Sequence, residues 1–338
     1  MMKIIKNYCW LLPMIALFSC KKEIRLKDPG SGRKIVLLGE LIAGDTVQLR
    51  AGQSAPVTGN AGKLLPAREM AMNISGSTGI FPLPYHNDGR EGFLFTSLYS
   101  QPGLIINPGT YTIEAGDAAI GAVSCTVNVP EPFEASITDT AAVVYDGKPA
   151  LELSIRISDR PGRSRYVFEA VKQAGYVDSL FVYNGVEHSY MTNWQLYDSL
   201  KSAGVTLHLR ADTLYTPIYT RLNVMTEDQR TANRRLPLHG LRRVLLDDGS
   251  FEGKVTDLRL LVDRKEFVSE LSKGKVVIRV RSVSEAYYQY LLAYELLQDA
   301  QQGISFEQPV LLESNVKNGL GIVGGVYEQR FDFLFDKW

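Results

Sequence analysis

The sequence predicts a mostly β protein, with an N-terminal Ig-like or transthyretin-like β-sandwich followed by a larger β-rich domain that contains one or two helices. Three observations support this prediction. Short stretches that alternate apolar and polar residues recur along the chain, turns with Gly and Pro separate them, and two stretches show helical spacing. The 338 residues, of which 45% are hydrophobic and 22% charged, are typical of a globular protein of about two domains.

The charge balance argues against one class of partner. The 37 basic and 37 acidic residues cancel, and the chain has no run of five or more like charges. Proteins that bind nucleic acid usually carry a basic excess on one face. Nucleic acid is therefore not expected as a partner.

The N-terminus has the pattern of a bacterial lipoprotein signal. Lys3 and Lys6 precede an uncharged, largely apolar run that ends at Ser19, and Cys20 follows. This run is shorter than the ~20 residues that span a bilayer. We expect residues 1–19 to be a cleaved signal peptide and Cys20 to carry diacylglycerol and fatty acid, such as palmitate. The alternative is an ordinary cleaved signal with a stray cysteine.

Lipidation changes what is expected of the mature chain. Residues 20–33 are expected to form a tether, and the loss of two lysines leaves 35 basic and 37 acidic residues, a net charge of −2. Cys125 is then the remaining thiol, so no intramolecular disulfide is expected. Its neighbours alternate like a strand, which predicts a buried and unreactive thiol.

The N-terminal sandwich is expected over residues 34–131. The turn Asn107-Pro108-Gly109-Thr110 favours a following strand, because Pro presets φ and Gly accepts a positive φ. The prolines after Val129 break the pattern and mark the expected boundary. Strands are expected at residues 35–41, 46–50, 70–74, 92–98, 111–115 and 122–129.

The second domain is expected over residues 132–338. A short helix is expected to begin at a cap on Asn193 and to end before Gly204. A longer helix near residues 284–301 follows Ser282 and Glu285, which have capping-box spacing. Strands are expected at residues 151–157, 165–171, 276–281 and 327–335.

Aromatic residues on the two expected helices are weak candidates for ligand contacts. For the tyrosines of the longer helix, the alternative is core packing with the hydroxyls at the rim. The candidates are Trp194, Tyr197, Tyr287, Tyr290 and Tyr294.

The residue types that carry chemistry are scattered. The four histidines lie 20 or more residues apart and form no metal-binding motif. Gly319–Gly324 fits the dinucleotide-binding pattern, but the remaining 14 residues are too few for the required βαβ unit. The glycines are instead expected to permit a tight crossing or a bulge in the last sheet. No cofactor, metal site or catalytic residue is predicted, although acids brought together by the fold could still form an active site.

The C-terminal region resembles a family signature. Residues 305–310 read SFEQPV, and residues 314–325 read SNVKNGLGIVGG. They are similar to the closing signature of the Bacteroidota lipoproteins grouped as domain of unknown function 4249. The signature turn contains Asn315, Asn318, Gly319 and Gly321. Further similar segments lie at residues 35–41, 107–111, 159–166 and 282–291, so the resemblance covers nearly the whole mature chain.

The resemblance implies a location and a partner. Family members are outer-membrane lipoproteins, often encoded beside TonB-dependent receptors that carry a carboxypeptidase-regulatory-like extension. This implies a lipid-anchored, non-enzymatic accessory subunit that binds ligand for such a receptor in nutrient uptake. Display at the cell surface is expected over the periplasmic face, although Lys21-Lys22-Glu23 departs from the acidic cluster that favours export. A structural or assembly factor of the envelope and a surface hydrolase are the alternatives.

Overall fold

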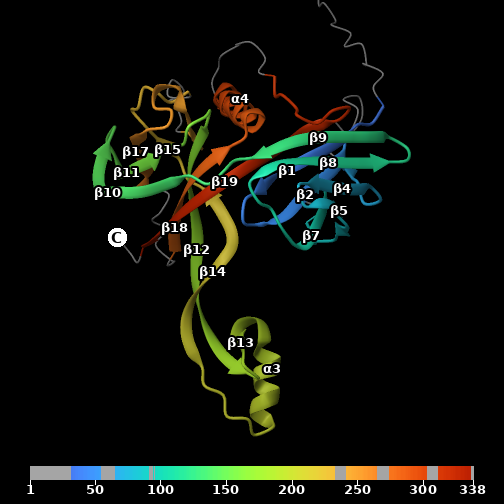
Figure 1. Ribbon diagram of the computed structural model, residues 1–338. Helices are drawn as coiled ribbons and strands as arrows, with labels where there is room; N and C mark the ends of the chain where they lie inside the picture. Colours follow the sequence, from blue (N-terminus) through green and yellow to red (C-terminus); the bar gives the residue numbers. More distant parts are fainter. Residues whose placement is uncertain are drawn as a thin grey trace, which may run out of the picture.

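A computed structural model describes residues 32–54, 65–90, 94, 96–232, 241–264, 274–302 and 311–335. In this part of the chain the strands build three sheets, and helices α3 and α4 accompany them (Figure 1). The prediction of a mostly β fold is therefore confirmed. The expected signal peptide, Cys20 and the tether up to residue 31 lie outside the described residues.

The N-terminal sandwich packs strands of the largest sheet against a separate four-stranded sheet. Buried residues recur at every second position on β9, as in a strand with one face on a core. Leu37, Leu49 and Ile113 are fully buried in this core, and Cys125 is 1% exposed, as expected. The strands are β1 (Ile35–Ile42), β2 (Thr46–Gln53), β3 (Leu65–Pro66), β4 (Ala71–Gly76), β5 (Gly79–Pro82), β6 (Tyr85–His86), β7 (Ser97–Ile105), β8 (Gly109–Asp117) and β9 (Gly121–Val129).

The second sandwich uses the other end of the same large sheet. Phe168 and Ile278 from this sheet pack against Ile155 and Leu260 from a second four-stranded sheet. The strands are β10 (Glu134–Tyr145), β11 (Lys148–Ser158), β12 (Arg165–Tyr183), β15 (Val224–Met225), β16 (Val244–Asp247), β17 (Val255–Asp263), β18 (Gly274–Val283) and β19 (Leu320–Phe335), with a short 3-10 helix, η2, at Asp248–Ser250.

Helix α4 (Glu285–Gln302) covers the opposite face of the large sheet (Figure 1). Tyr288 and Leu291 pack against Ile322 and Val326 of β19 and form a third, smaller core. Glu285 in the first turn is favourably placed next to the positive end of the helix dipole. The helix expected near residues 284–301 is thus present.

The first and last strands, β1 and β19, are neighbours in the large sheet. Strand β19 pairs in parallel with β1, and its other edge pairs antiparallel with β18. The large sheet, in the order β13-β12-β18-β19-β1-β2-β7-β6, therefore runs through both sandwiches. The expected domain boundary near residue 131 falls between β9 and β10, but it stays a prediction because the two parts share one sheet.

A projecting arm extends from the body in the direction opposite to α4 (Figure 1). Strand β12 continues past Ala174, its last residue paired with β18, and there pairs with β13 (Val186–Ser189) and β14 (Arg210–Arg221). Helix α3 (Tyr190–Ser202) follows β13 and packs against β12 through the rings of Tyr197 and Phe181. We call residues 175–215 the arm.

Several of the expected elements differ from those observed. β12 is 19 residues long, whereas the expected strand covered residues 165–171 only. The expected cap of α3 on Asn193 is wrong: Ser189 is the cap, and its hydroxyl accepts a hydrogen bond from the Thr192 N–H at 3.3 Å. Asn193 lies inside the helix at a kink, where its side-chain amide donates to the Ser189 carbonyl at 3.0 Å. The strand expected at 92–98 lies partly outside the described residues, and β7 begins at Ser97.

Candidate functional site

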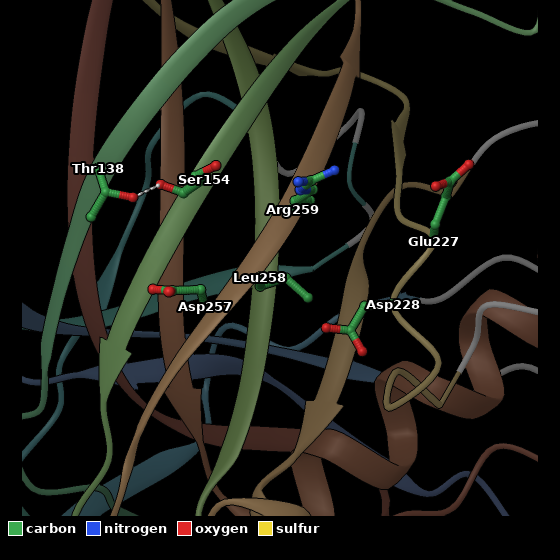
Figure 2. A pocket seen from close by; sticks show the side chains of 7 residues that line it. All are labelled: Thr138, Ser154, Glu227, Asp228, Asp257, Leu258 and Arg259. Carbon is green, nitrogen blue, oxygen red and sulfur yellow. Dashed lines mark hydrogen bonds between the residues drawn. The ribbon is translucent and has the colours of Figure 1, made fainter.

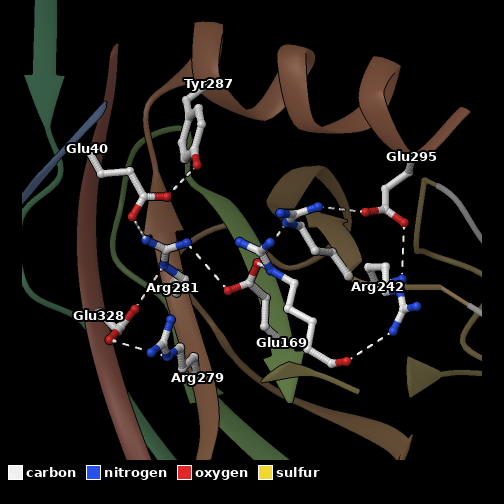
Figure 3. A network of polar contacts seen from close by, with 10 residues as sticks. Glu40, Glu169, Arg242, Arg279, Arg281, Tyr287, Glu295 and Glu328 are labelled. Carbon is white, nitrogen blue, oxygen red and sulfur yellow. Dashed lines mark hydrogen bonds and ion pairs between the residues drawn. The ribbon is translucent and has the colours of Figure 1, made fainter. Parts of the chain in front are cut away.

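A network of charged side chains lies beneath α4, where β12, β18, β19 and β1 are neighbours in the large sheet (Figure 3). Its central member is Arg281 on β18, which is 2% exposed. Arg281 pairs with Glu40 of β1, with Glu328 of β19 at 3.0 Å and with Glu169 of β12 at 3.5 Å. Four strands thus share one guanidinium.

The network continues from the sheet into the helix. Arg243, which precedes β16, contacts Glu169 at 2.7 Å and Glu295 of α4 at 2.8 Å. Arg221 at the end of β14 adds a contact with Glu169 at 3.4 Å. Uncompensated buried charges are costly, and here each buried carboxylate faces at least one guanidinium.

The pairing fixes the ionisation state of the network. Burial alone would raise the pKa of the Glu40 carboxyl, but the charge and hydrogen bond of Arg281 and the hydrogen bond from Tyr287 outweigh burial and lower it to about 2. Burial also opposes ionisation of Glu169, yet Arg281 and Arg243 hold its pKa below the usual value. Burial and the Glu40 charge raise the pKa of Tyr287. Groups held so firmly in one protonation state are suited to joining elements, not to moving protons at neutral pH.

Two of the family-like segments meet at the start of α4. Arg165, 2% exposed, contacts Glu285 at 2.9 Å and lies 5.3 Å from the centre of the Tyr288 ring. The hydroxyl of Tyr166 donates to Asp159, which also accepts the backbone N–H of Gly253 at 2.8 Å. The segments 159–166 and 282–291 therefore form one packing unit between β12 and α4.

The signature turn closes the N-terminal sandwich. The Asn315 side chain donates to the Val323 carbonyl at 2.8 Å and accepts the Val323 N–H at 3.1 Å. It therefore pairs with the backbone of β19 as a residue of a neighbouring strand would. Asn318 adopts a positive φ of 61°. A Cβ on Gly321 would lie 2.0 Å from the Leu37 carbonyl oxygen, and one on Gly319 would lie 2.8 Å from that of Ile35. The sequence predicts a tight crossing or a bulge here, whereas the glycines permit β19 to lie close beside β1, its parallel neighbour in the sheet. This gives them a structural role.

A polar pocket of about 460 Å³ lies on the smaller sheet of the second sandwich (Figure 2). Hydrogen bonds from Arg230 lower the pKa of Asp228, and a bidentate contact with Arg156 lowers that of Asp257. Both acids are therefore ionised at neutral pH and engaged with arginines. The lining residues are Thr138, Ser154, Glu227, Asp228, Asp257, Leu258 and Arg259.

The arm carries an unusual share of exposed apolar surface. Of 17 large hydrophobic residues exposed in the described part of the chain, seven lie in its 41 residues. Within the arm, Phe181 of β12 and Tyr197 of α3 are buried against one another, with ring centroids 5.2 Å apart. A high share of exposed apolar side chains on one projecting element is typical of interaction sites on soluble domains. The seven residues are Tyr176, Val177, Val182, Val186, Met191, Trp194 and Leu209.

The candidate aromatic residues fall into two separate groups. Trp194 is 51% exposed on α3, whereas Tyr197 on the same helix is buried. On α4 the rings of Tyr287, Tyr290 and Tyr294 stack in a row, with centroids 6.4 and 6.2 Å apart. The two groups lie on opposite sides of the body (Figure 1), and none of their members lines the pocket of Figure 2. Their role in ligand contact stays a prediction.

Sequence reasoning missed both the charge network and the arm. Arg279 and Arg281 stand at alternate positions of an otherwise apolar strand, and Glu40 interrupts another, a pattern that indicates charges pointing into the fold. The dipeptide Asn184-Gly185 lies between two alternating runs, a pattern that strongly predicts a β-hairpin and could have located the arm. Both residues have positive φ, 51° and 77°.

The described ranges hold neither a metal-binding cluster nor a membrane-spanning helix. They contain no group of three or more His, Cys, Asp or Glu residues arranged to hold a metal ion. Nor is any helix among them long and apolar enough to cross a membrane.

Comparison with known proteins gives a family and one distant structure. A family model described as "Domain of unknown function (DUF4249)" matches residues 21–331. No curated protein matches the chain. A solved structure from Corynebacterium diphtheriae, described as a "Putative membrane anchored protein", is 13% identical, with a TM-score of 0.16. The match covers 76% of this chain and 55% of that one, and so low a TM-score carries no argument about fold.

Proposed function

The chain belongs to the DUF4249 family, described as a domain of unknown function. From its N-terminal sequence, the family resemblance and its exposed arm, we propose that it is a lipid-anchored, non-enzymatic accessory subunit of the outer membrane that binds a TonB-dependent receptor in nutrient uptake. The arm is the observation that carries this proposal. A hairpin that projects from the body and exposes seven large apolar side chains is suited to contact with another protein. Trp, Tyr and Met, all present among the seven, are enriched in protein interfaces.

The anchor is Cys20, modified with diacylglycerol and fatty acid. Each buried CH₂ contributes about 0.8 kcal/mol, so several acyl chains retain a protein firmly in a bilayer. The outer membrane, and its cell-surface face over the periplasmic one, follow from the family resemblance.

A non-enzymatic role is supported by the state of the acids. Hydrolysis by general acid catalysis needs a carboxyl that keeps its proton near neutral pH. In the polar pocket, arginines lower the pKa of both Asp228 and Asp257. Burial raises the pKa of Asp248, but this residue is not among those that line the pocket. A surface hydrolase is therefore the least supported reading.

A second candidate role is an assembly or structural factor of the envelope. It is favoured by the pocket lining, which contains no aromatic side chain, whereas sites for small organic ligands are mostly apolar and aromatic. The receptor-binding role accounts better for the exposed apolar arm, since a purely structural body would not need one.

Co-purification tests the proposal. The full-length chain with a C-terminal affinity tag is expressed together with TonB-dependent receptors of its own organism and extracted in mild detergent. The wild-type chain is expected to retain the receptor, and Met191→Ser/Trp194→Ser to lose most of it. The matched control is Ile80→Ser/Val144→Ser, which changes two residues that are 74% and 76% exposed outside the arm. A wild-type chain that never retains the receptor would overturn the proposal.

A further inference from the structure

The outer edge of β14 is open. Within the described part of the chain, β14 pairs only with β12, so the backbone groups on its other side have no strand partner. The backbone N–H of Thr213 donates to the carboxylate of Asp212 at 2.8 Å. This side chain takes the place that a carbonyl oxygen of a neighbouring strand would have. Because N–H groups along a strand alternate in direction, those of Ala211 and Tyr215 point to the same outer side as that of Thr213.

An exposed edge of this kind is complementary to one class of molecule. Its repeating donors and acceptors match the backbone of an extended polypeptide, which can add to the sheet as a further strand. Pro217 has no backbone N–H, which confines the useful edge to residues 210–216. Leu209, which is exposed and directly precedes Arg210, lies at one end of this edge and offers an apolar contact to an added strand.

The charge of the arm argues against a lipid surface as its occupant. Residues 175–215 contain four acids, Asp178, Glu187, Asp198 and Asp212, and two bases, Lys201 and Arg210, which gives 2 − 4 = −2. Surfaces that dock on bacterial anionic lipids carry an excess of Lys and Arg. A polypeptide segment that is apolar and without net negative charge fits the arm better.

We propose that an extended segment of the receptor adds as a strand to the outer edge of β14 over Arg210–Tyr215. This inference rests on the proposed function and specifies how the partner is bound. In the free chain the Asp212 carboxylate occupies the outward N–H of Thr213, and in the complex a carbonyl oxygen of the receptor segment replaces it.

Two substitutions with opposite expected effects test the inference. Thr213→Pro removes the outward backbone N–H of residue 213 and leaves the N–H groups that face β12 in place. It should weaken receptor binding about tenfold. Asp212→Ala removes the carboxylate that accepts the Thr213 N–H in the free chain. The N–H is then available to the receptor, so this substitution should strengthen binding several-fold. Binding of the detergent-solubilised receptor to the immobilised lipidated chain is measured for each variant. Thermal unfolding by circular dichroism checks that each variant keeps its fold, and Asp198→Ala, a change at an exposed acid on α3, is the control.

Amide hydrogen exchange of the wild-type complex gives a second, mutation-free readout. Exchange is expected to slow at Ala211, Thr213 and Tyr215 and to change little at Asp212 and Leu214, since strand addition protects alternate amides. Receptor binding that is insensitive to both substitutions, with no alternating protection, overturns strand addition and leaves the proposed function standing. Protection in the chain alone that increases with its concentration also overturns it, because a second copy would then occupy the edge. A receptor that does not bind the wild-type chain overturns the proposed function itself.

Discussion

Glu40 on β1 and Arg281 on β18 form an ion pair across β19, the strand that separates them in the sheet. One belongs to the N-terminal sandwich and the other to the second sandwich. Tyr287 of α4 donates its hydroxyl to the same carboxylate. Glu40 therefore joins β1 to a strand and a helix that lie more than 240 residues further along the chain.

Replacing Glu40 with Gln should destabilise the fold strongly. The substitution leaves the Arg281 guanidinium, which is 2% exposed, without one of its carboxylates, and breaking a buried pair typically costs about 3–5 kcal/mol. Urea unfolding followed by circular dichroism gives the change in the free energy of unfolding. Asp139→Asn, at an exposed acid on β10, should change it by less than about 0.5 kcal/mol. Equal effects of the two substitutions would show that the pair does not stabilise the fold.

The same pair predicts a specific dependence of stability on pH. The pKa of Glu40 is about 2 in the folded protein and 4.5 when unperturbed, so the unfolded chain binds the proton more readily. Its contribution, about 3 kcal/mol, is fully present above pH 4.5 and is lost as the pH falls toward 2. Unfolding free energies measured from pH 6 to pH 2.5 should therefore fall more steeply for the wild-type chain than for Glu40→Gln. Parallel curves would contradict the assignment.

Gly321 should tolerate no side chain. A Cβ there would lie 2.0 Å from the Leu37 carbonyl oxygen, so β19 could not keep its register beside β1. Gly321→Ala is expected to cost more than about 4 kcal/mol or to prevent folding. Gly121 has nearly the same φ, +108° against +107°, but no atom within 4 Å of its Cβ position. Gly121→Ala should cost only the backbone strain, about 1–2 kcal/mol, in the same unfolding measurement. Similar losses of unfolding free energy for the two substitutions would mean that backbone strain, and not the close approach to β1, explains the need for glycine at position 321.

Much of the fold could be predicted from local patterns, because the type of a strand or helix depends largely on residues that are close in the sequence. Alternation located β2, short apolar runs located β1 and β18, and the spacing from Glu285 onward located α4. A close backbone approach at the glycine run was also expected, and Gly321 has one to the Leu37 carbonyl, although through parallel pairing with β1 and not through a crossing or a bulge. The cap on Asn193 was wrong because Ser189, four residues earlier, can supply the same hydrogen bond.

What the sequence did not reveal depends on residues that are distant in the chain. Glu40, Glu169 and Glu328 come from three strands. The pairing of β12 and β19 with β18, together with the parallel pairing of β1 with β19, brings them around Arg281. The open edge of β14 is likewise a property of the sheet order. A strand pattern shows that a segment is extended, but not whether a second neighbour lies beside it.

The thiols of the mature chain test both the core and the anchor. Burial raises the pKa of Cys125 to about 12, and the residue is 1% exposed, so at pH 8 its sulfur is protonated and shielded. A maleimide reagent should leave the native protein unlabelled over hours and should label it rapidly in guanidinium. If Cys20 carries its lipid through a thioether, the denatured mature chain reacts at one thiol only, as counted by mass spectrometry. Rapid labelling of the native protein would contradict the burial of Cys125, and two reactive thiols after denaturation would contradict lipidation of Cys20.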